Sequence, residues 1–323
     1  MIKEWIEEPR PGLKLGRIIF DNPVLDRHSC PVIEMSGGPG PLLCIMSGIH
    51  INEASSIAAA ANLADHFDPA TLKGTISIIP VVSTHNLFKY TLVTPPSAGR
   101  DLHWSYPGSP DGTFNEALAY ALLNDWGRNA DVLLDLHGGD LDERMTRYVV
   151  IQSTEDPAFN ARARALASCF DTSLVVELAA TGDAEFGRCC TALSAQRKLG
   201  LVSEAGDSGT PDAESIQWHT RGILQVAAWL GMIPSAFKGR EDQAYLDRYE
   251  WITAPQAGLV ERTFEPGEWI ESGEVIGIVR DFYGRVISEI RAPASGFVMM
   301  QKTTQIASKG YWIGSVAIPR GQD

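Results

Sequence analysis

Residues 42–67 have the sequence LLCIMSGIHINEASSIAAAANLADHF, and this stretch decides the fold class. The short apolar run at 42–48 and the longer Ala-rich segment after it are typical of a buried strand leading into a helix that covers a sheet. The same alternation recurs from about residue 40 to residue 230. The chain is therefore predicted to contain an α/β domain with a mixed or parallel sheet.

The pattern places six strands and three helices in this domain. The strands are short and rich in branched residues, and the helices are rich in Ala and Leu and bounded by Gly, Asp or Pro. Strands are predicted at 42–48, 75–82, 132–137, 148–152, 173–178 and 200–205, and helices at 53–67, 114–127 and 158–170. The stretch 83–113 has several prolines and no clear period, and loops of that length are usually functional or disordered.

After Trp229 a charged segment with Gly and Pro precedes a different pattern, so a domain boundary is predicted near 231–249. Residues 1–240 are expected to form the α/β domain with a β-rich N-terminal lead-in, and 241–323 a smaller all-β domain. Two segments of the second part, APQAGLV at 254–260 and APASGFV at 292–298, share one pattern. They predict a pseudo-symmetric β-sandwich or barrel-like module, and the hairpin between them lacks the lysine of a lipoyl or biotin carrier.

Composition excludes several classes of function. The 323 residues have a formal charge of -13 and no basic run, which disfavours nucleic acid and anionic lipid as partners. No window approaches the roughly 20 apolar residues of a membrane span, and the N-terminus lacks a secretory signal, so a cytoplasmic location is expected. Five cysteines without C-x-x-C spacing are expected to be buried thiols. A homo-oligomer is compatible with this composition.

Potential metal ligands follow two of the predicted strands. His50 and Glu53 lie three residues apart after the first strand, and His137 ends the strand at 132–137. Ligands in open α/β sheets bind at such strand ends, and two His with one Glu leave a position for water in a hydrolytic zinc site. One zinc ion per chain is therefore predicted, and it would lower the pKa of that water from about 15.7 to about 7.

Two further carboxylates complete the predicted site. Asp135 lies two residues before His137 on the same strand face, where it is expected to orient a ligand imidazole. Glu204 ends the last apolar strand and is the candidate general base. Alternative histidine ligands are His85, His103 and His219, whereas His28 and His66 are expected on the surface or in helices.

These motifs resemble the succinylglutamate desuccinylase and aspartoacylase family, relatives of the zinc carboxypeptidases. GIHINE at 48–53, DLHG at 135–138 and EAG at 204–206 correspond to its G-x-H-x-x-E, D-x-H-G and E-x-G motifs, and Asn86 resembles the Asn of its N-P-x-A segment. The resemblance spans nearly the whole chain, including the C-terminal β-module. It implies a zinc carboxypeptidase-like fold and hydrolysis of the amide in a small N-acyl amino acid.

One family motif is altered. The family commonly has D/N-L-N-R-x-F-P-G, in which the Asn-Arg pair binds substrate carboxylate, but residues 101–108 here are DLHWSYPG. Trp104 in place of Arg cannot bind a carboxylate bidentately. Either Arg100, Arg144 or Arg147 replaces the missing group, or Trp104 stacks on an apolar or cationic group of a different substrate. The candidate substrate-binding residues are Asn86, Arg100, His103 and Trp104.

Three functions remain open at this point. The first is a zinc-dependent amidohydrolase that deacylates N-acyl amino acids. The second is a zinc carboxypeptidase acting on peptides, which the altered motif disfavours. The third is a non-catalytic small-molecule-binding relative, against which Glu204 argues, because a purely structural metal site needs no base.

Overall fold

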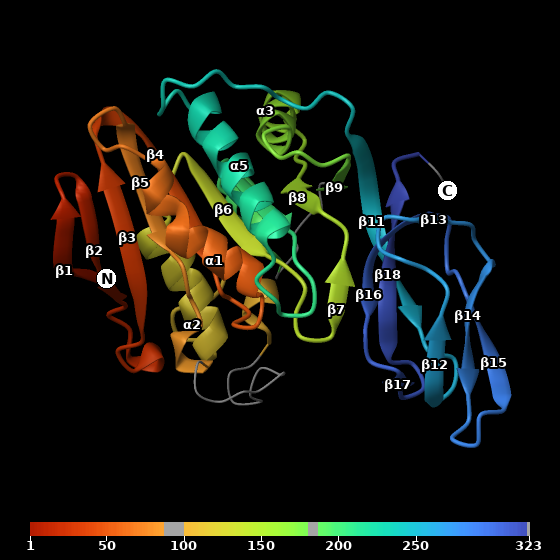
Figure 1. Cartoon of the computed structure of the whole chain (residues 1–323). Helices are drawn as coiled ribbons and strands as arrows, with labels where there is room; N and C mark the ends of the chain where they lie inside the picture. The colour runs from red at the N-terminus through yellow and green to blue at the C-terminus, as the bar shows by residue number, and fades with distance from the viewer. Residues whose placement is uncertain (87–99, 180–186, 322–323) are drawn as a thin grey trace.

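The computed structural model describes residues 1–86, 100–179 and 187–321, and a large mixed sheet runs through it (Figure 1). In these residues fourteen strands are hydrogen-bonded in the order β1-β2-β3-β5-β4-β6-β10-β8-β9-β11-β18-β16-β13, with β7 paired to β16. The first ten strands are β1 (Ile2–Arg10), β2 (Leu13–Ile19), β3 (Ser29–Ser36), β4 (Gly38–Ser47), β5 (Lys73–Ile79), β6 (Val132–His137), β7 (Glu143–Met145), β8 (Tyr148–Gln152), β9 (Leu174–Leu178) and β10 (Leu199–Glu204).

All six predicted strands of the α/β part are confirmed as β4, β5, β6, β8, β9 and β10. The neighbours β5, β4, β6 and β10 are parallel, whereas β8 runs antiparallel to β10, so the sheet is mixed. Every residue of β6 and β10 is buried. Burial on both faces explains why these strands are continuous apolar runs in the sequence.

Helices cover both faces of this sheet. They are α1 (Ala54–Asn62), α2 (Phe114–Ala121), α3 (Pro157–Ala167), α4 (Cys189–Ala195) and α5 (Ala213–Trp229). One apolar core includes residues of α1, α3 and α5, and a second core, on the other face, includes residues of α2 and α4. The three predicted helices are confirmed as α1, α2 and α3 with short continuations. No helix among the described residues is long and apolar enough to cross a membrane.

The C-terminal part is all β, as predicted. The strands β11, β18, β16 and β13 extend the large sheet, and β15-β14-β12-β17 form a second sheet. Residues of both sheets make up a separate apolar core of this part of the chain. Their bounds are β11 (Ala244–Thr253), β12 (Gly258–Arg262), β13 (Trp269–Ile270), β14 (Val275–Arg280), β15 (Val286–Arg291), β16 (Gly296–Lys302), β17 (Ile306–Ala307) and β18 (Trp312–Pro319).

The two repeated segments occupy corresponding places in the two sheets. Gly258 begins β12 and Gly296 begins β16. A Cβ added at Gly258 would lie 2.2 Å from the carbonyl oxygen of Arg280, and one added at Gly296 would lie 2.3 Å from that of Ala317. Glycine is therefore required at both places because a backbone carbonyl of the neighbouring strand approaches closely.

The predicted boundary at 240/241 falls just before β11, but the sheet continues across it. Residues Ala244 to Leu246 of β11 pair in parallel with Leu174 to Val176 of β9. Leu246 also belongs to a core of the α/β part. The division into 1–240 and 241–323 stays a prediction.

Two predictions about single residue types have clear outcomes. All five cysteines are buried and none is in a disulfide, as predicted. The prediction for His28 is wrong: it is 8% exposed, and its Nε2 lies 3.0 Å from the carbonyl oxygen of Val82, to which it donates as the Nε2–H tautomer. The side chain is buried because it packs against the rings of Phe20 and Phe114, with ring centres 6.5 Å and 5.5 Å away.

Candidate metal centre and active site

The candidate site lies at the carboxyl ends of three neighbouring parallel strands, β4, β6 and β10 (Figure 1). His137 is the last residue of β6 and Glu204 the last of β10, and the two are partners in the sheet register. His50 and Glu53 follow β4 in the turn that leads into α1. Parallel strands end at the same sheet edge, so four residues distant in sequence meet there.

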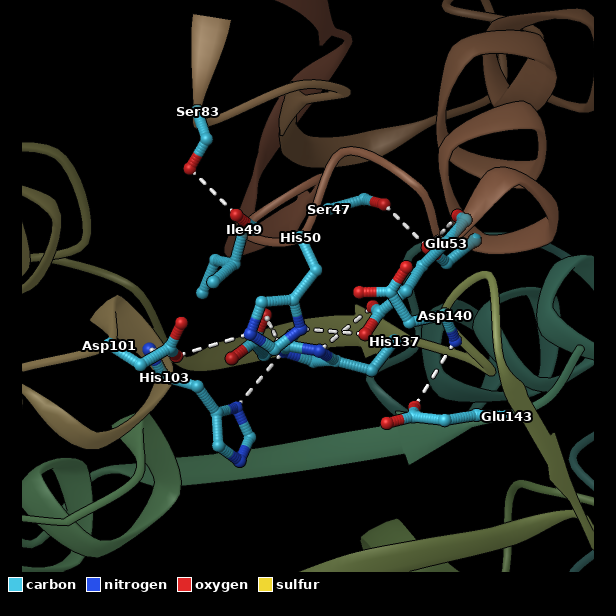
Figure 2. A network of polar contacts seen from close by, with 12 residues as sticks. Ser47, Ile49, His50, Glu53, Ser83, Asp101, His103, His137, Asp140 and Glu143 are labelled. Carbon is cyan, nitrogen blue, oxygen red and sulfur yellow. Dashed lines mark hydrogen bonds and ion pairs between the residues drawn. The ribbon is translucent and has the colours of Figure 1, made fainter. Parts of the chain in front are cut away.

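The turn after β4 depends on Gly48. Its φ of +64 lies in the left-handed region that residues with a Cβ disfavour, and an added Cβ would lie 3.0 Å from Cα of Val81. Ser83 holds the same turn from the other side, because its hydroxyl donates to the carbonyl oxygen of Ile49 at 2.7 Å (Figure 2). The position of His50 is therefore set by the end of β4 and by the segment after β5.

His50, Glu53 and His137 point toward one another (Figure 2). His50 Nδ1 lies 2.6 Å from Glu53 Oε1, and His137 Nδ1 lies 3.0 Å from Glu53 Oε2. The three potential ligand atoms lie within 4.8 Å of one another. Glu53 Oε2 is buried and accepts no hydrogen bond of good geometry from the described residues, which fits an oxygen that ligates a cation.

Each histidine of this group turns its other nitrogen toward an aspartate. His50 Nε2 lies 3.1 Å from Asp101 Oδ1, and His137 Nε2 lies 3.1 Å from Asp135 Oδ1. A carboxylate in this position fixes the ring orientation and keeps Nδ1 available as a ligand atom. The sequence analysis predicted this orienting role for Asp135 but not for Asp101. Asp101 lies in the stretch 83–113, which has no clear period.

The charges of the group reinforce one another. Burial alone would raise the pKa of Glu53, but His50 and His137 outweigh it and lower that pKa to about 2. Burial alone would lower the pKa of both histidines, yet the carboxylates of Glu53, Asp101 and Asp135 raise them well above the ordinary value. Without a cation, the group therefore holds protons where a metal ion would supply the positive charge.

A second group, His103 with Asp135 and His137, also brings ligand atoms within 4.8 Å of one another. Its geometry fits a cation less well. His103 Nε2 lies 2.9 Å from Nε of Arg188, and because arginine only donates, this nitrogen accepts and the ring proton is on Nδ1. His103 Nδ1, 3.2 Å from His137 Nε2, is then not free to ligate.

Another of the alternative histidines is His219 on α5. Its Nδ1 lies 3.1 Å from the hydroxyl of Ser203 and its Nε2 lies 3.2 Å from the carbonyl oxygen of Ala205. Both ring nitrogens therefore have partners in the core. Neither His219 nor His85 belongs to a possible ligand group in the described residues.

Glu204 lies beside this group and faces the same pocket. It is 8% exposed, and burial raises its pKa to about 8, against the lowering effect of His137. A carboxyl group with a pKa near neutrality is able both to accept and to return a proton. This property fits the predicted role of a general base.

The pocket has a volume of about 620 Å³ and is lined by both parts of the chain. The α/β part contributes the ligand group, Glu204 and Arg188. The strands β11, β16 and β18 contribute Tyr249, Trp251, Met300, Trp312 and Ser315. The C-terminal β-module therefore forms one wall of the pocket.

The predicted substrate-binding residues lie in different places. His103 and Trp104 line the pocket, whereas Asn86 and Arg100 are not among the lining residues in the described chain. Arg144 and Arg147 line another cavity of about 470 Å³, so they are poor substitutes for the missing arginine. Sequence reasoning missed Arg188, which follows the second segment outside the described residues, and no local motif marks it.

Comparison with known proteins agrees with this geometry. Residues 39–230 match the family described as Succinylglutamate desuccinylase/Aspartoacylase catalytic domain. A similar protein is the N-alpha-acetyl-L-2,4-diaminobutyric acid deacetylase of Halomonas elongata, which is 26% identical over 293 residues, or 89% of this chain and 85% of the relative.

Two solved structures share the fold. The product-bound ectoine utilization protein EutE (DoeB) from Ruegeria pomeroyi has a TM-score of 0.82 at 22% identity, with 98% of both chains covered. The succinylglutamate desuccinylase/aspartoacylase from Rhodobacter sphaeroides has a TM-score of 0.81 at 23% identity, again with 98% of both chains covered. Because the family match covers more than half of the chain, the protein belongs to the succinylglutamate desuccinylase/aspartoacylase family.

Proposed function

We propose that the protein is a zinc-dependent amidohydrolase that cleaves the amide bond of a small N-acyl amino acid, with one zinc ion per chain. The observation that carries this proposal is the convergence of His50, Glu53 and His137 beside Glu204 in one pocket. Two imidazole nitrogens and a carboxylate form a ligand set suited to zinc, and they leave a position open.

Zinc held by these residues would polarise the amide carbonyl and make a water molecule acidic near neutral pH. Glu204 takes a proton from the attacking water and gives it to the amine nitrogen as the carbon–nitrogen bond breaks. The acyl group leaves as a carboxylate. Burial raises the pKa of Glu204 in the metal-free protein, and the charge of a zinc ion beside it would favour the ionised form that accepts the proton.

The similar deacetylase from Halomonas elongata supports the choice of an amide in an N-acyl amino acid. The pocket supports a small substrate, because strands of the C-terminal module close one side of it. A peptide carboxypeptidase would need room for a chain on that side. The cytoplasmic location and a homo-oligomeric state, both expected from the sequence, belong to this proposal as predictions.

The test is release of amine from a panel of N-acetyl, N-succinyl and N-formyl amino acids and diamines, with and without a chelator. Chelator-sensitive release from at least one member, restored by zinc, is the expected result. No release from any member by zinc-loaded protein would contradict the proposal and favour a peptide substrate or the non-catalytic alternative.

A further inference from the structure

Trp104 occupies the position at which the family motif has a substrate-binding arginine, yet an arginine side chain lies against it. The guanidinium carbon of Arg188 is 4.1 Å from the centre of the Trp104 ring. Arg188 immediately precedes α4, so it reaches this place from a different part of the chain. The loss of arginine at position 104 is therefore accompanied by an arginine that packs on its replacement.

Three contacts determine how Arg188 is held. Its Nε donates to Nε2 of His103 at 2.9 Å, and Trp104 covers the guanidinium at cation–π distance. The ring centre of Tyr249, from β11, is 5.6 Å from the guanidinium carbon. Of the two residues that hold Arg188, His103 is buried at 6% exposure, whereas Trp104 is 40% exposed and lines the pocket.

His103 is suited to this contact because its Nε2 accepts a hydrogen bond from Nε of Arg188 at 2.9 Å. The asparagine of the family motif is also polar, but its side chain is shorter. The exchange of Asn for His and of Arg for Trp therefore changes two adjacent residues into two supports for one guanidinium.

These contacts leave the two terminal amino groups of the Arg188 guanidinium without a partner in the described residues. Its two terminal amino groups make no hydrogen bond, and no carboxylate pairs with it, within residues 1–86, 100–179 and 187–321. Arg188 nevertheless lines the same pocket as Glu204 and the ligand group. An arginine with Nε bound and both terminal groups unpaired presents a fork whose geometry matches a carboxylate.

We propose that Arg188 binds a carboxylate of the substrate, and that His103 and Trp104 are positioning residues that hold its guanidinium in the pocket. This inference rests on the proposed function and names its substrate class, an N-acyl amino acid whose free carboxylate reaches Arg188. The carboxylate belongs either to the amino acid or to the acyl group, as in a succinyl amide. Either source would present a carboxylate to Arg188, and the experiment below distinguishes between them.

The test compares zinc-loaded wild type with Arg188→Ala. The substrates are the best member of the N-acyl panel, its carboxamide, and the N-succinyl derivative of that carboxamide. Arg188→Ala is expected to raise KM about 10- to 100-fold for whichever substrate has the bound carboxylate, with no rise for the carboxamide. Arg147→Ala, which removes an arginine lining the separate cavity of about 470 Å³, is the matched control and is expected to keep the wild-type KM.

The positioning role is tested by Trp104→Ala and Trp104→Phe. The Ala variant is expected to raise KM for the carboxylate substrate without lowering kcat, and the Phe variant to restore KM because it keeps an aromatic face. Equal KM values in wild type and Arg188→Ala, or an equal effect of Arg147→Ala, would overturn the proposal.

Binding of each free product, the amino acid and the carboxylic acid of the acyl group (succinate for a succinyl amide), is measured by calorimetry and separates this inference from the proposed function. Product binding that is lost in Arg188→Ala would support the anchor even if wild type released no amine. If both products bind to this variant as they bind to wild type, the anchor is overturned, whereas any observed hydrolysis stays intact.

Discussion

At the scale of single residues, the site is organised by charge. One buried carboxylate, Glu53, lies between two imidazoles, and each imidazole contacts an aspartate on its far side. This alternation of negative and positive groups orients Nδ1 of each ring toward Glu53. The metal affinity should therefore depend on residues that do not ligate.

We expect Asp101→Asn and Asp135→Asn each to weaken zinc binding by about 10- to 100-fold, because the ligand imidazoles lose a carboxylate that orients them. Zinc titration against a competing chelator measures this change. Asp247→Asn is the control, since Asp247 lines the pocket but pairs with Arg320 at 3.1 Å. Wild-type affinity in both ligand-side variants would contradict the assigned role.

Glu204 is expected to lower the stability of the metal-free protein as the pH rises. Its pKa is raised from 4.5 to about 8 on folding, so between these values the folded state keeps a proton that the unfolded state loses. Stability associated with the protonated group is complete below pH 4.5 and is lost as pH rises through 8. At high pH, the free energy of unfolding of Glu204→Gln should therefore be about 1 kcal/mol or more above that of wild type.

Urea unfolding of both proteins with a chelator present, at pH values of about 4 and about 8.5, measures this difference. A stability gap between the variants that is the same at both pH values would show that the effect is not due to ionisation of Glu204.

At the scale of elements, the residues of the candidate site lie at or just after strand ends, and the turns after the strands determine where their side chains lie. Gly48 and Gly231 both have positive φ, +64 and +70, but only Gly48 has a neighbour where a Cβ would lie. Each glycine ends an element of the α/β part. Substitutions at these two glycines therefore distinguish the effect of backbone strain from the effect of moving the turn that bears His50.

Gly48→Ala and Gly231→Ala should each cost about 1–2 kcal/mol of stability from the left-handed backbone. Gly48→Ala must in addition move the turn away from Val81, 3.0 Å from the added Cβ, and so shift His50. Zinc affinity is expected to fall in Gly48→Ala alone. Equal affinities in the two variants, measured by titration, would mean that the turn does not position the ligand.

The elements that could be predicted from sequence are those whose signal is local. Buried parallel strands are continuous apolar runs, and residues at their ends, such as His137 and Glu204, are recognisable from the strand alone. The helix α5 was missed because Gly222 interrupts its pattern, yet an added Cβ there would lie 2.3 Å from the Phe170 ring. Its glycine serves tertiary packing, which the local sequence does not show.

At the scale of the whole molecule, the pocket belongs to both parts of the chain. The sequence predicted an all-β module after residue 240, but the pairing of β11 with β9 depends on contacts between distant segments. The same is true of Asp101 and Arg188, which come from stretches without a period and reach the site only through the fold. The candidate metal ligands and the candidate base were predictable from the sequence, whereas other residues that line the pocket, such as Arg188, were not.

The most direct test of the central claim is the rate of amine release by wild type and Glu204→Gln at equal, measured zinc content. A general base contributes about 10²- to 10⁴-fold, so the variant should lose at least about 100-fold in kcat while binding one zinc ion per chain. A variant that retains the wild-type kcat with zinc bound would contradict the assignment of Glu204, and with it the proposed mechanism.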